Sequence, residues 1–152
     1  MKHRAELTLV PQLLSGTADD DEIKSCFPVF HELRPHLRNE MSFCEQVRRQ
    51  HRVSDYDISV IRLASTVVSA IGFRISEHLA WGKVLYIDDL STLSNHRNLG
   101  CAASLLNWAA DYGKAEACEA MHLDSGYGRK HAHRLYLKQG FELVSHHFSR
   151  HL

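Results

Sequence analysis

One segment of the chain combines an arginine, a glycine and a predicted helix start, and this combination is suited to binding a phosphate group. Residues 94–106 read SNHRNLGCAASLL. The first amides of a helix lack partners within the helix and carry partial positive charge, so they attract phosphate or pyrophosphate. Gly100 lets a ligand approach the backbone closely, and the guanidinium of Arg97 can donate two hydrogen bonds to phosphate oxygens. The alternative is that Gly100 only permits a tight turn between a strand and a helix.

Two other phosphate-binding loops are excluded by the sequence. A dinucleotide-binding fold requires G-x-G-x-x-G after its first strand, and a P-loop requires G-x-x-x-x-G-K-[ST]. Neither pattern occurs anywhere in the chain. What the segment at 94–106 binds therefore has to be inferred from the elements around it.

A pair of acidic residues is a second candidate for chemistry. Asp88 and Asp89 stand together in an otherwise apolar run that is typical of a strand. Because side chains alternate along a strand, one of the two carboxylates is expected on each side of the sheet. A carboxylate there is costly without a partner or a function. Either one of them serves as a general base, or they only cap loop amides or pair with Arg129 or Arg134.

These residues must be positioned by a mixture of strands and helices. Alternating apolar and polar residues predict strands, and apolar residues at intervals of three and four predict helices. The strands are expected at 5–10, 58–63, 67–75, 83–93, 120–123 and 141–148. The helices are expected from the acids at 19–22 to Pro35, after the cap Asn39, from Ala102 to a C-cap at Gly113, and over 130–139. The three central strands read as an antiparallel meander.

Length and composition predict a single domain that spans residues 1–152. The chain is 44% hydrophobic, which is enough to fill one core. Its 18 Lys and Arg residues balance its 18 Asp and Glu residues, so there is no net field to hold a polyanion, and we expect no nucleic-acid partner. No run approaches the roughly 20 apolar residues of a membrane span, and the four cysteines form no C-x-x-C pair. We therefore expect a cytoplasmic protein without a membrane partner.

The histidines raise the question of a metal site. The chain has twelve, and five of them lie between residues 131 and 151. His131 and His133 are two positions apart on a predicted helix, so they do not share a face, and no H-E-x-x-H motif is present. We therefore expect no metal ion.

Three motifs in order resemble the GNAT superfamily of acetyl-CoA-dependent N-acetyltransferases. Residues 97–102, RNLGCA, match the superfamily pattern [QR]-x-x-G-x-[GA], which follows a strand and opens a helix. Residues 86–93 look like the strand before that pattern, and residues 135–141, LYLKQGF, look like its later F-Y-x-x-x-G-F signature. The resemblance implies an α/β fold of the α+β type, with a mixed, mostly antiparallel central sheet of six to seven strands flanked by about four helices.

The resemblance also implies where acetyl-CoA binds. Pantetheine is expected in a gap between the fourth and fifth strands, paired with backbone groups, and the pyrophosphate is expected on the amides of the loop. Arg129 stands where the superfamily usually has asparagine, and it is expected to reach pantetheine or phosphate oxygens instead. His133 is expected on the cofactor side of the cleft. The cofactor-binding residues implied in this way are Leu90, Ser91, Thr92, Arg97, Asn98, Leu99, Gly100, Cys101, Ala102, Arg129 and His133.

For catalysis, the resemblance makes Tyr136 the candidate general acid, because it holds the superfamily's tyrosine position four residues before Gly140. The alternative is an aromatic side chain packed on the final strand. Asp124 stands where some members carry a basic carboxylate, and we rank Asp88 and Asp124 ahead of Asp89 as the general base. The acidic residues near the cleft favour a cationic amine acceptor. Trp81 either forms a wall of the amine pocket or belongs to a hairpin tip or dimer contact.

The expected function is therefore N-acetylation. The acetyl group of acetyl-CoA would move directly, in a ternary complex, to a primary amine of a small molecule or a protein. A catalytically silent domain that binds or senses acyl-CoA is the alternative from another class. The resemblance leaves a homodimer open.

Overall fold

The computed structural model describes residues 9–152, and in this part of the chain it contains five strands, five α-helices and one short 3-10 turn. In chain order the elements are β1 (Gln12–Leu14), α1 (Asp20–Ser25), α2 (Phe27–Leu33), α3 (Glu40–Ser54), β2 (Asp57–Leu63), β3 (Thr66–His78), β4 (Gly82–Thr92), the 3-10 turn (Ser94–His96), α4 (Cys101–Ala115), β5 (Ala120–Leu123) and α5 (Lys130–Lys138). The strand predicted at 5–10 lies mostly outside the described residues. Its last two residues, Leu9 and Val10, have no regular structure, and β1 begins after Pro11.

The strands form one mixed sheet in the order β1-β2-β3-β4-β5. The first three pairings are antiparallel, which confirms the predicted meander, and β4 pairs with β5 in parallel. The described part of the chain thus has five strands in its sheet, where six to seven were expected. The fold class is as predicted.

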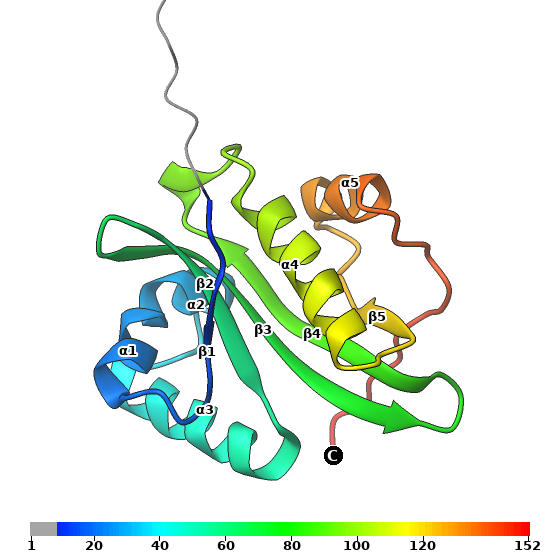
Figure 1. The fold of residues 1–152 in the computed structure, drawn as a ribbon, viewed down its shortest axis with the longest axis horizontal. Coiled ribbons are helices and arrows are strands. Elements are labelled where there is room, and N and C mark those ends of the chain that lie inside the picture. Colours follow the sequence, from blue (N-terminus) through cyan, green and yellow to red (C-terminus); the bar gives the residue numbers. More distant parts are fainter. Residues whose placement is uncertain (1–8) are drawn as a thin grey trace, which may run out of the picture.

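Helices cover both faces of this sheet, as Figure 1 shows. On one face, α1, α2 and α3 enclose a core that includes Val67 and Ala70 of β3. On the other face, α4 packs over a second core that includes Val68 and Ile71 of the same strand. Because successive side chains of a strand point to opposite faces, the apolar run of β3 serves both cores.

The helix predicted between the acids at 19–22 and Pro35 is two helices. The side chain of Asp19 caps α1 by accepting a hydrogen bond from the amide of Glu22 at 2.9 Å. Cys26 ends α1 and begins α2, and Pro28 lies in the first turn of α2. Proline has no amide hydrogen to donate and is tolerated at a helix start, so it favours a new helix here over a continuous one. The predicted cap of α3 is confirmed, because Asn39 accepts from the amide of Ser42 at 2.9 Å.

Two further predictions are wrong. Gly113 does not end α4 but lies inside it, where a Cβ would come within 3.5 Å of Leu85, and the helix continues to Ala115. Residues 141–148 do not form a strand: they have no regular structure, and Leu143 and Phe148 are 89% and 90% exposed. No described strand pairs with this segment. The amide of Phe141 donates to the carbonyl oxygen of Tyr136 at 3.0 Å, and side-chain contacts include His146 to Tyr127 and His147 to Asp124.

Candidate active site

The loop before α4 has the geometry that its sequence predicted. Gly100 is the N-cap of α4 and has φ of +89°, a conformation that favours glycine, and Asn98 has φ of +60°. A Cβ at Gly100 would meet only Leu9, at 3.7 Å, so the backbone here is open to a ligand. No side chain caps α4 within the described chain, which leaves the first amides of a fifteen-residue helix available to an anion.

Arg97 lies beside this loop but is paired with a carboxylate. Its Nη2 donates to Glu32 of α2 at 2.7 Å, and its Nε donates to the carbonyl oxygen of Thr92 at 3.2 Å. The other carboxylate oxygen of Glu32 accepts from the amide of Ser94 at 3.2 Å. Glu32 thus connects the loop before α4 to α2. The sequence reasoning missed it, because no local pattern links residue 32 to residue 97.

Beyond the loop, β4 and β5 separate. β5 pairs only with residues 84–87 of β4, whereas residues 88–92 continue along β3. Along Leu90, Ser91 and Thr92, the edge of β4 that faces β5 therefore has no strand partner in the described structure. This matches the gap that the resemblance implied.

A small cavity of about 90 Å³ lies where the two strands separate. It brings together Tyr136 and the three predicted carboxylates, Asp88, Asp89 and Asp124. The remaining residues that line it are Leu33, Arg34, Ile87, Leu90, Leu123, Ser125, Gly126 and Arg129. Three parts of the chain that are far apart in sequence, residues 33–34, 87–90 and 123–136, supply these residues.

Asp88 and Asp89 do not face opposite sides of the sheet, so that prediction is wrong. Gly72 pairs with Asp89 while the next residue, Phe73, pairs with Ile87, so Asp88 is the extra residue of a β-bulge. A bulge interrupts the alternation of side chains. Both carboxylates consequently line a second, larger cavity of about 280 Å³ beneath α2 and α3.

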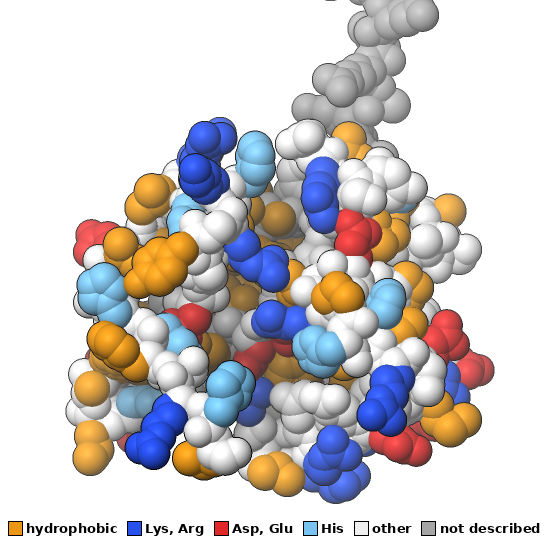
Figure 2. All heavy atoms as spheres, turned by 180° about the vertical axis from the view of Figure 1, so that it is seen from behind, with side chains coloured by type: hydrophobic (Ala, Val, Ile, Leu, Met, Phe, Trp, Pro, Cys, Tyr) orange, Lys and Arg blue, Asp and Glu red, His pale blue; other side chains and the backbone are white. Residues whose placement is uncertain are grey.

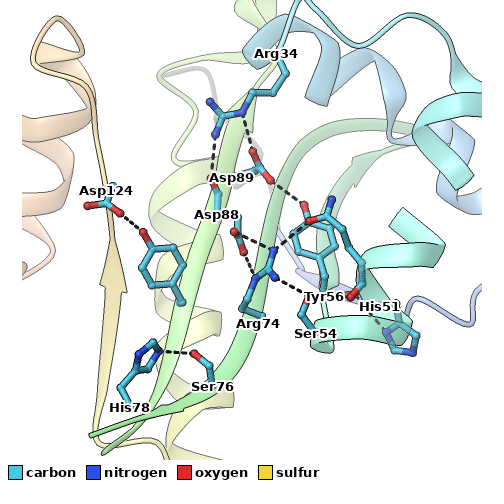
Figure 3. Close-up of polar contacts among 12 residues, drawn as sticks. Arg34, His51, Ser54, Tyr56, Arg74, Ser76, His78, Asp88, Asp89 and Asp124 are labelled. Carbon is cyan, nitrogen blue, oxygen red and sulfur yellow. Dashed lines mark hydrogen bonds and ion pairs between the residues drawn. The ribbon is translucent and has the colours of Figure 1, made fainter. Parts of the chain in front are cut away.

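Each of these two carboxylates has an arginine partner, as Figure 3 shows. Arg74 donates to both oxygens of Asp88, from Nε at 2.9 Å and from Nη2 at 3.1 Å. Arg34 donates from Nε to Asp89 at 2.9 Å, and the hydroxyl of Tyr56 donates to the other oxygen of Asp89 at 2.9 Å. The pairing with Arg129 or Arg134 that was considered from the sequence is therefore not formed by Asp88 or Asp89.

The same surroundings shift several pKa values. Burial raises the pKa of Asp88 above its usual range, although Arg74 opposes this shift. Burial, together with the nearby charge of Asp89, raises the pKa of Tyr56 well above its usual value. Burial also raises the pKa of Tyr136, which keeps its hydroxyl protonated at neutral pH. The raised pKa of Asp88 suits its predicted role as a base, because a base needs a pKa closer to neutrality. The protonated hydroxyl of Tyr136 suits its predicted role as an acid, because an acid needs a proton to give.

Asp124 has a partner that the sequence did not reveal. The hydroxyl of Tyr86 on β4 donates to Oδ2 of Asp124, and Nδ1 of His147 lies 3.5 Å from the same atom (Figure 3 shows the Asp124 contact). Burial and the hydrogen bond to Asp124 raise the pKa of Tyr86. Asp124 is therefore held at the end of β5 by a residue of the neighbouring strand.

The remaining predicted residues lie at the edges of the site. Arg129 is the N-cap of α5 and lines the smaller cavity, while the ring of His133 donates from Nε2 to the carbonyl oxygen of Gly126 at 3.0 Å. Tyr136 also packs edge-on against Phe141, with ring centroids 5.8 Å apart. Trp81 belongs to the hairpin between β3 and β4, stacks on His122 at 4.3 Å and lines neither of the two cavities, which agrees with the hairpin alternative.

One sequence signal could have identified part of the missed network. Gly72 interrupts an apolar strand, and a glycine in that place often marks a bulge or a close approach. In the structure, a Cβ at Gly72 would lie 1.9 Å from the hydroxyl of Tyr56. The glycine therefore makes room for the tyrosine that holds Asp89.

Residues 9–152 show neither a metal-binding cluster nor a helix that could span a membrane. In this range, no three or more His, Cys, Asp and Glu side chains are grouped so that they could hold a metal ion. None of the helices described has the length and apolar character needed to cross a membrane. On the face shown in Figure 2, basic, acidic and histidine side chains are interspersed around a hollow.

Comparisons with known proteins identify relatives of this chain. The family model of the Acetyltransferase (GNAT) family matches residues 20–141. The chain is 29% identical over 136 residues to the uncharacterized N-acetyltransferase YhdJ of Bacillus subtilis (strain 168), a match that covers 86% of this chain and 92% of the relative. It is 27% identical over 147 residues to an aminoalkylphosphonate N-acetyltransferase of Salmonella typhimurium (strain LT2), which covers 93% of this chain and 92% of the relative.

Solved structures agree on the fold. The aminoglycoside N-acetyltransferase AAC(6')-Iy, in complex with CoA, superposes with a TM-score of 0.79 at 11% identity, covering 96% of this chain and 97% of that chain. The family match spans β2 to β5, the loop before α4 and Tyr136, and the curated relatives are N-acetyltransferases. The predicted resemblance is confirmed: the chain is an acyltransferase and belongs to the acetyltransferase (GNAT) family.

Proposed function

We propose that this protein transfers the acetyl group of acetyl-CoA directly to the primary amine of an acceptor, within a ternary complex. The observation that carries the proposal is the meeting of Tyr136 with three carboxylates in the cavity between the separating ends of β4 and β5, next to an uncapped helix start. A neighbouring cavity of about 280 Å³ offers a place for the acceptor.

Acetyl-CoA fits the backbone of this region. The pyrophosphate would lie on the amides of residues 98–102, where Gly100 leaves the approach open. Arg97 would contact the phosphates by exchanging its ion pair with Glu32 for one with them, since an exposed ion pair of this kind contributes only about 0–1 kcal/mol. The pantetheine would use the unpaired edge of β4 at residues 90–92, as an added strand does.

The chemistry begins with a proton on the amine. An alkylammonium group has a pKa near ~10.4, so a base must remove its proton before the nitrogen can attack. We assign this role to Asp88, because it lines both cavities and because burial raises its pKa. Arg74 holds both oxygens of Asp88, so the carboxylate keeps its orientation.

The reaction ends with a proton on sulfur. The free amine attacks the thioester carbonyl carbon, and a backbone amide near Leu90 or Thr92 would stabilise the oxyanion. The C–S bond then breaks, the hydroxyl of Tyr136 gives its proton to the departing thiolate, and the attacking nitrogen loses its extra proton to solvent, from which Tyr136 is reprotonated. Asp124 shares the cavity with Tyr136 and is the second candidate for the base.

The acceptor class is supported by the relatives. One curated relative is named for aminoalkylphosphonates and a structural neighbour for aminoglycosides, so both are named for amine-bearing compounds. The test is a panel of primary amines in which the release of CoA from acetyl-CoA is followed with a thiol reagent. CoA release that requires both acetyl-CoA and an amine supports the proposal.

The competing function is a silent domain that binds acyl-CoA without turnover. It predicts a rise in melting temperature with acetyl-CoA but no amine-dependent CoA release across the panel. Only an enzyme loses CoA release when Tyr136 is replaced by phenylalanine while the affinity for acetyl-CoA stays the same.

A further inference from the structure

The larger cavity has a composition that restricts the acceptor. It lies between the end of α2, the loop that follows, α3 and β4, with a volume of about 280 Å³. Drug-sized ligands occupy sites of roughly 300–1,000 Å³. This cavity therefore suits a short amine, or one end of a longer one. The residues that line it are Phe30, Arg34, His36, Leu37, Phe43, Gln46, Val47, Gln50, Tyr56, Asp88 and Asp89.

The charges of the cavity are balanced before any acceptor enters. Asp88 is paired with Arg74, and Asp89 is paired with Arg34. A site built for a polycation needs carboxylates in excess, because each additional ammonium group must replace its hydration shell with an opposite charge. Here the two carboxylates can neutralise one ammonium group of the acceptor. The arginine beside them, Arg34, can then bind a second, negatively charged group of the same molecule.

Arg34 is placed to hold that second group. It ends α2, lines both cavities, and its side chain is 40% exposed. Its Nε binds Asp89, and its Nη2 donates to the carbonyl oxygen of Asp88 at 3.1 Å. Its Nη1 makes no hydrogen bond to any residue that the structure describes, whereas Arg74 uses all three of its nitrogens.

Two further features of the lining favour the larger cavity as the place for the acid group. His36 lines it two residues after Arg34, so a second donor faces the same space. The reactive end of the acceptor must point the other way, toward Tyr136 in the smaller cavity. Arg34 and Asp88 line both cavities, so a short molecule can put its amine near Asp88 while its other end meets the guanidinium. Figure 3 shows that Arg34 lies close to Asp88 of β4.

We propose that the acceptor is a short primary amine that carries an acidic group, a carboxylate or a phosphonate, and that Arg34, with His36, binds this group. The inference rests on the proposed acetyl transfer and narrows the expected cationic acceptor to a zwitterion. The guanidinium and the acid group form a charge-assisted hydrogen bond at the unused Nη1. Arg34 is thus a specificity-determining residue.

The test compares acceptors of similar length that differ in their far end. These are 3-aminopropanoate, 2-aminoethylphosphonate, n-propylamine and 1,3-diaminopropane, each assayed for CoA release at saturating acetyl-CoA. We expect kcat/KM for at least one of the two acidic amines to exceed that for n-propylamine and for 1,3-diaminopropane by tenfold or more. The acidic amine with the higher kcat/KM shows whether the site prefers a carboxylate or a phosphonate.

A variant series then assigns the preference to Arg34. Arg34→Gln keeps an amide donor for Asp89 and removes the charge, so the ratio of kcat/KM between the preferred acidic amine and n-propylamine should fall at least tenfold. Arg34→Lys should restore part of that ratio. Arg62→Gln is the matched control, because Arg62 lines neither cavity and binds Ser65 and Ser25 instead. A loss of stability alone would lower both rates and leave the ratio unchanged.

The possible outcomes distinguish a failure of this inference from a failure of the proposed acetyl transfer. Equal or better turnover of n-propylamine or 1,3-diaminopropane overturns the inference and leaves acetyl transfer standing. A ratio that Arg34→Gln does not change overturns the role of Arg34. If no amine in the panel supports CoA release although acetyl-CoA raises the melting temperature, the proposed function itself fails, and the inference fails with it.

Discussion

At the scale of single residues, neighbours in the sequence have different surroundings. Asp88 and Asp89 share the larger cavity, yet one is fixed by Arg74 and the other by Arg34 and Tyr56. Desolvation raises the pKa of Asp88, which favours the transfer of a proton from an ammonium group to this carboxylate. The roles proposed for the carboxylates therefore depend on their partners and not on their residue type.

The first prediction concerns the acid. Tyr136→Phe removes only the hydroxyl, so kcat should fall about 100-fold, which is typical for the loss of one general acid. The dissociation constant for acetyl-CoA should stay within about twofold, because the variant keeps the ring that packs on Phe141. Tyr112→Phe is the matched control: Tyr112 lies on α4, stacks on Trp108 and lines neither cavity. Unchanged turnover in Tyr136→Phe would show that another group protonates the thiolate.

The second prediction separates the two carboxylates ranked highest for the base. Asp88→Asn should lower kcat/KM for the preferred amine at pH 7 by about 100-fold, because the amide cannot accept the ammonium proton. The deficit should shrink at pH 10, where the amine loses its proton unaided. Asp124→Asn, assayed in parallel, should lose less. A larger, pH-sensitive loss in Asp124→Asn would move the assignment to that residue.

At the scale of elements, the site depends on two irregularities of β4: its bulge and its separation from β5. The sequence predicted the glycine turn that begins α4 and the cap Asn39, because both are encoded within a few consecutive residues. It did not predict the bulge, because that depends on the register between β3 and β4. The sequence did not predict the roles of Arg34, Tyr56 and Arg74 either, because the aspartates that they bind lie 14 to 55 residues away.

The third prediction tests the packing at the bulge. Gly72→Ala puts a Cβ against the hydroxyl of Tyr56, where only 1.9 Å is available, so Tyr56 must shift away from Asp89. Overpacking of this kind costs about 1–3 kcal/mol, to be measured by urea unfolding. Gly128→Ala is the control, because a Cβ there meets nothing within 4 Å. Equal stability of Gly72→Ala and Gly128→Ala would contradict the packing described for Tyr56.

At the scale of the whole molecule, one sheet separates two cores and carries the site at the ends of two of its strands. The core under α1, α2 and α3 contains Cys26, which is fully buried. Burial raises the pKa of its thiol to about 11 from 9.0. Because this core lies beneath the larger cavity, its stability also supports the position of Arg34 and Asp89.

The fourth prediction follows from that thiol. Between pH 9 and pH 11 the unfolded chain loses the Cys26 proton while the folded chain keeps it, so the free energy of unfolding falls as the pH rises. The stabilisation is fully present below pH 9. From pH 8 to pH 10.5 the contribution of this group falls by about 2 kcal/mol. Urea unfolding measures the fall in the free energy of unfolding from pH 8 to pH 10.5, and this fall should be smaller by that amount in Cys26→Ala than in the wild type. An equal fall in both proteins would contradict the burial of the thiol in the folded state.

The central claim is that acetyl-CoA binds through the loop that begins α4, and its most direct test is thermal unfolding at increasing acetyl-CoA concentrations. Binding stabilises the folded state by about 2.7 kcal/mol at 100 times the dissociation constant, which corresponds to a rise of about 5–10 °C for a chain of this size. In Gly100→Val the new side chain blocks the phosphate approach, so the rise above that variant's own melting temperature should largely disappear, whereas Gly128→Val should keep it. No rise in the wild type at millimolar acetyl-CoA, or an equal rise in Gly100→Val, would contradict the claim.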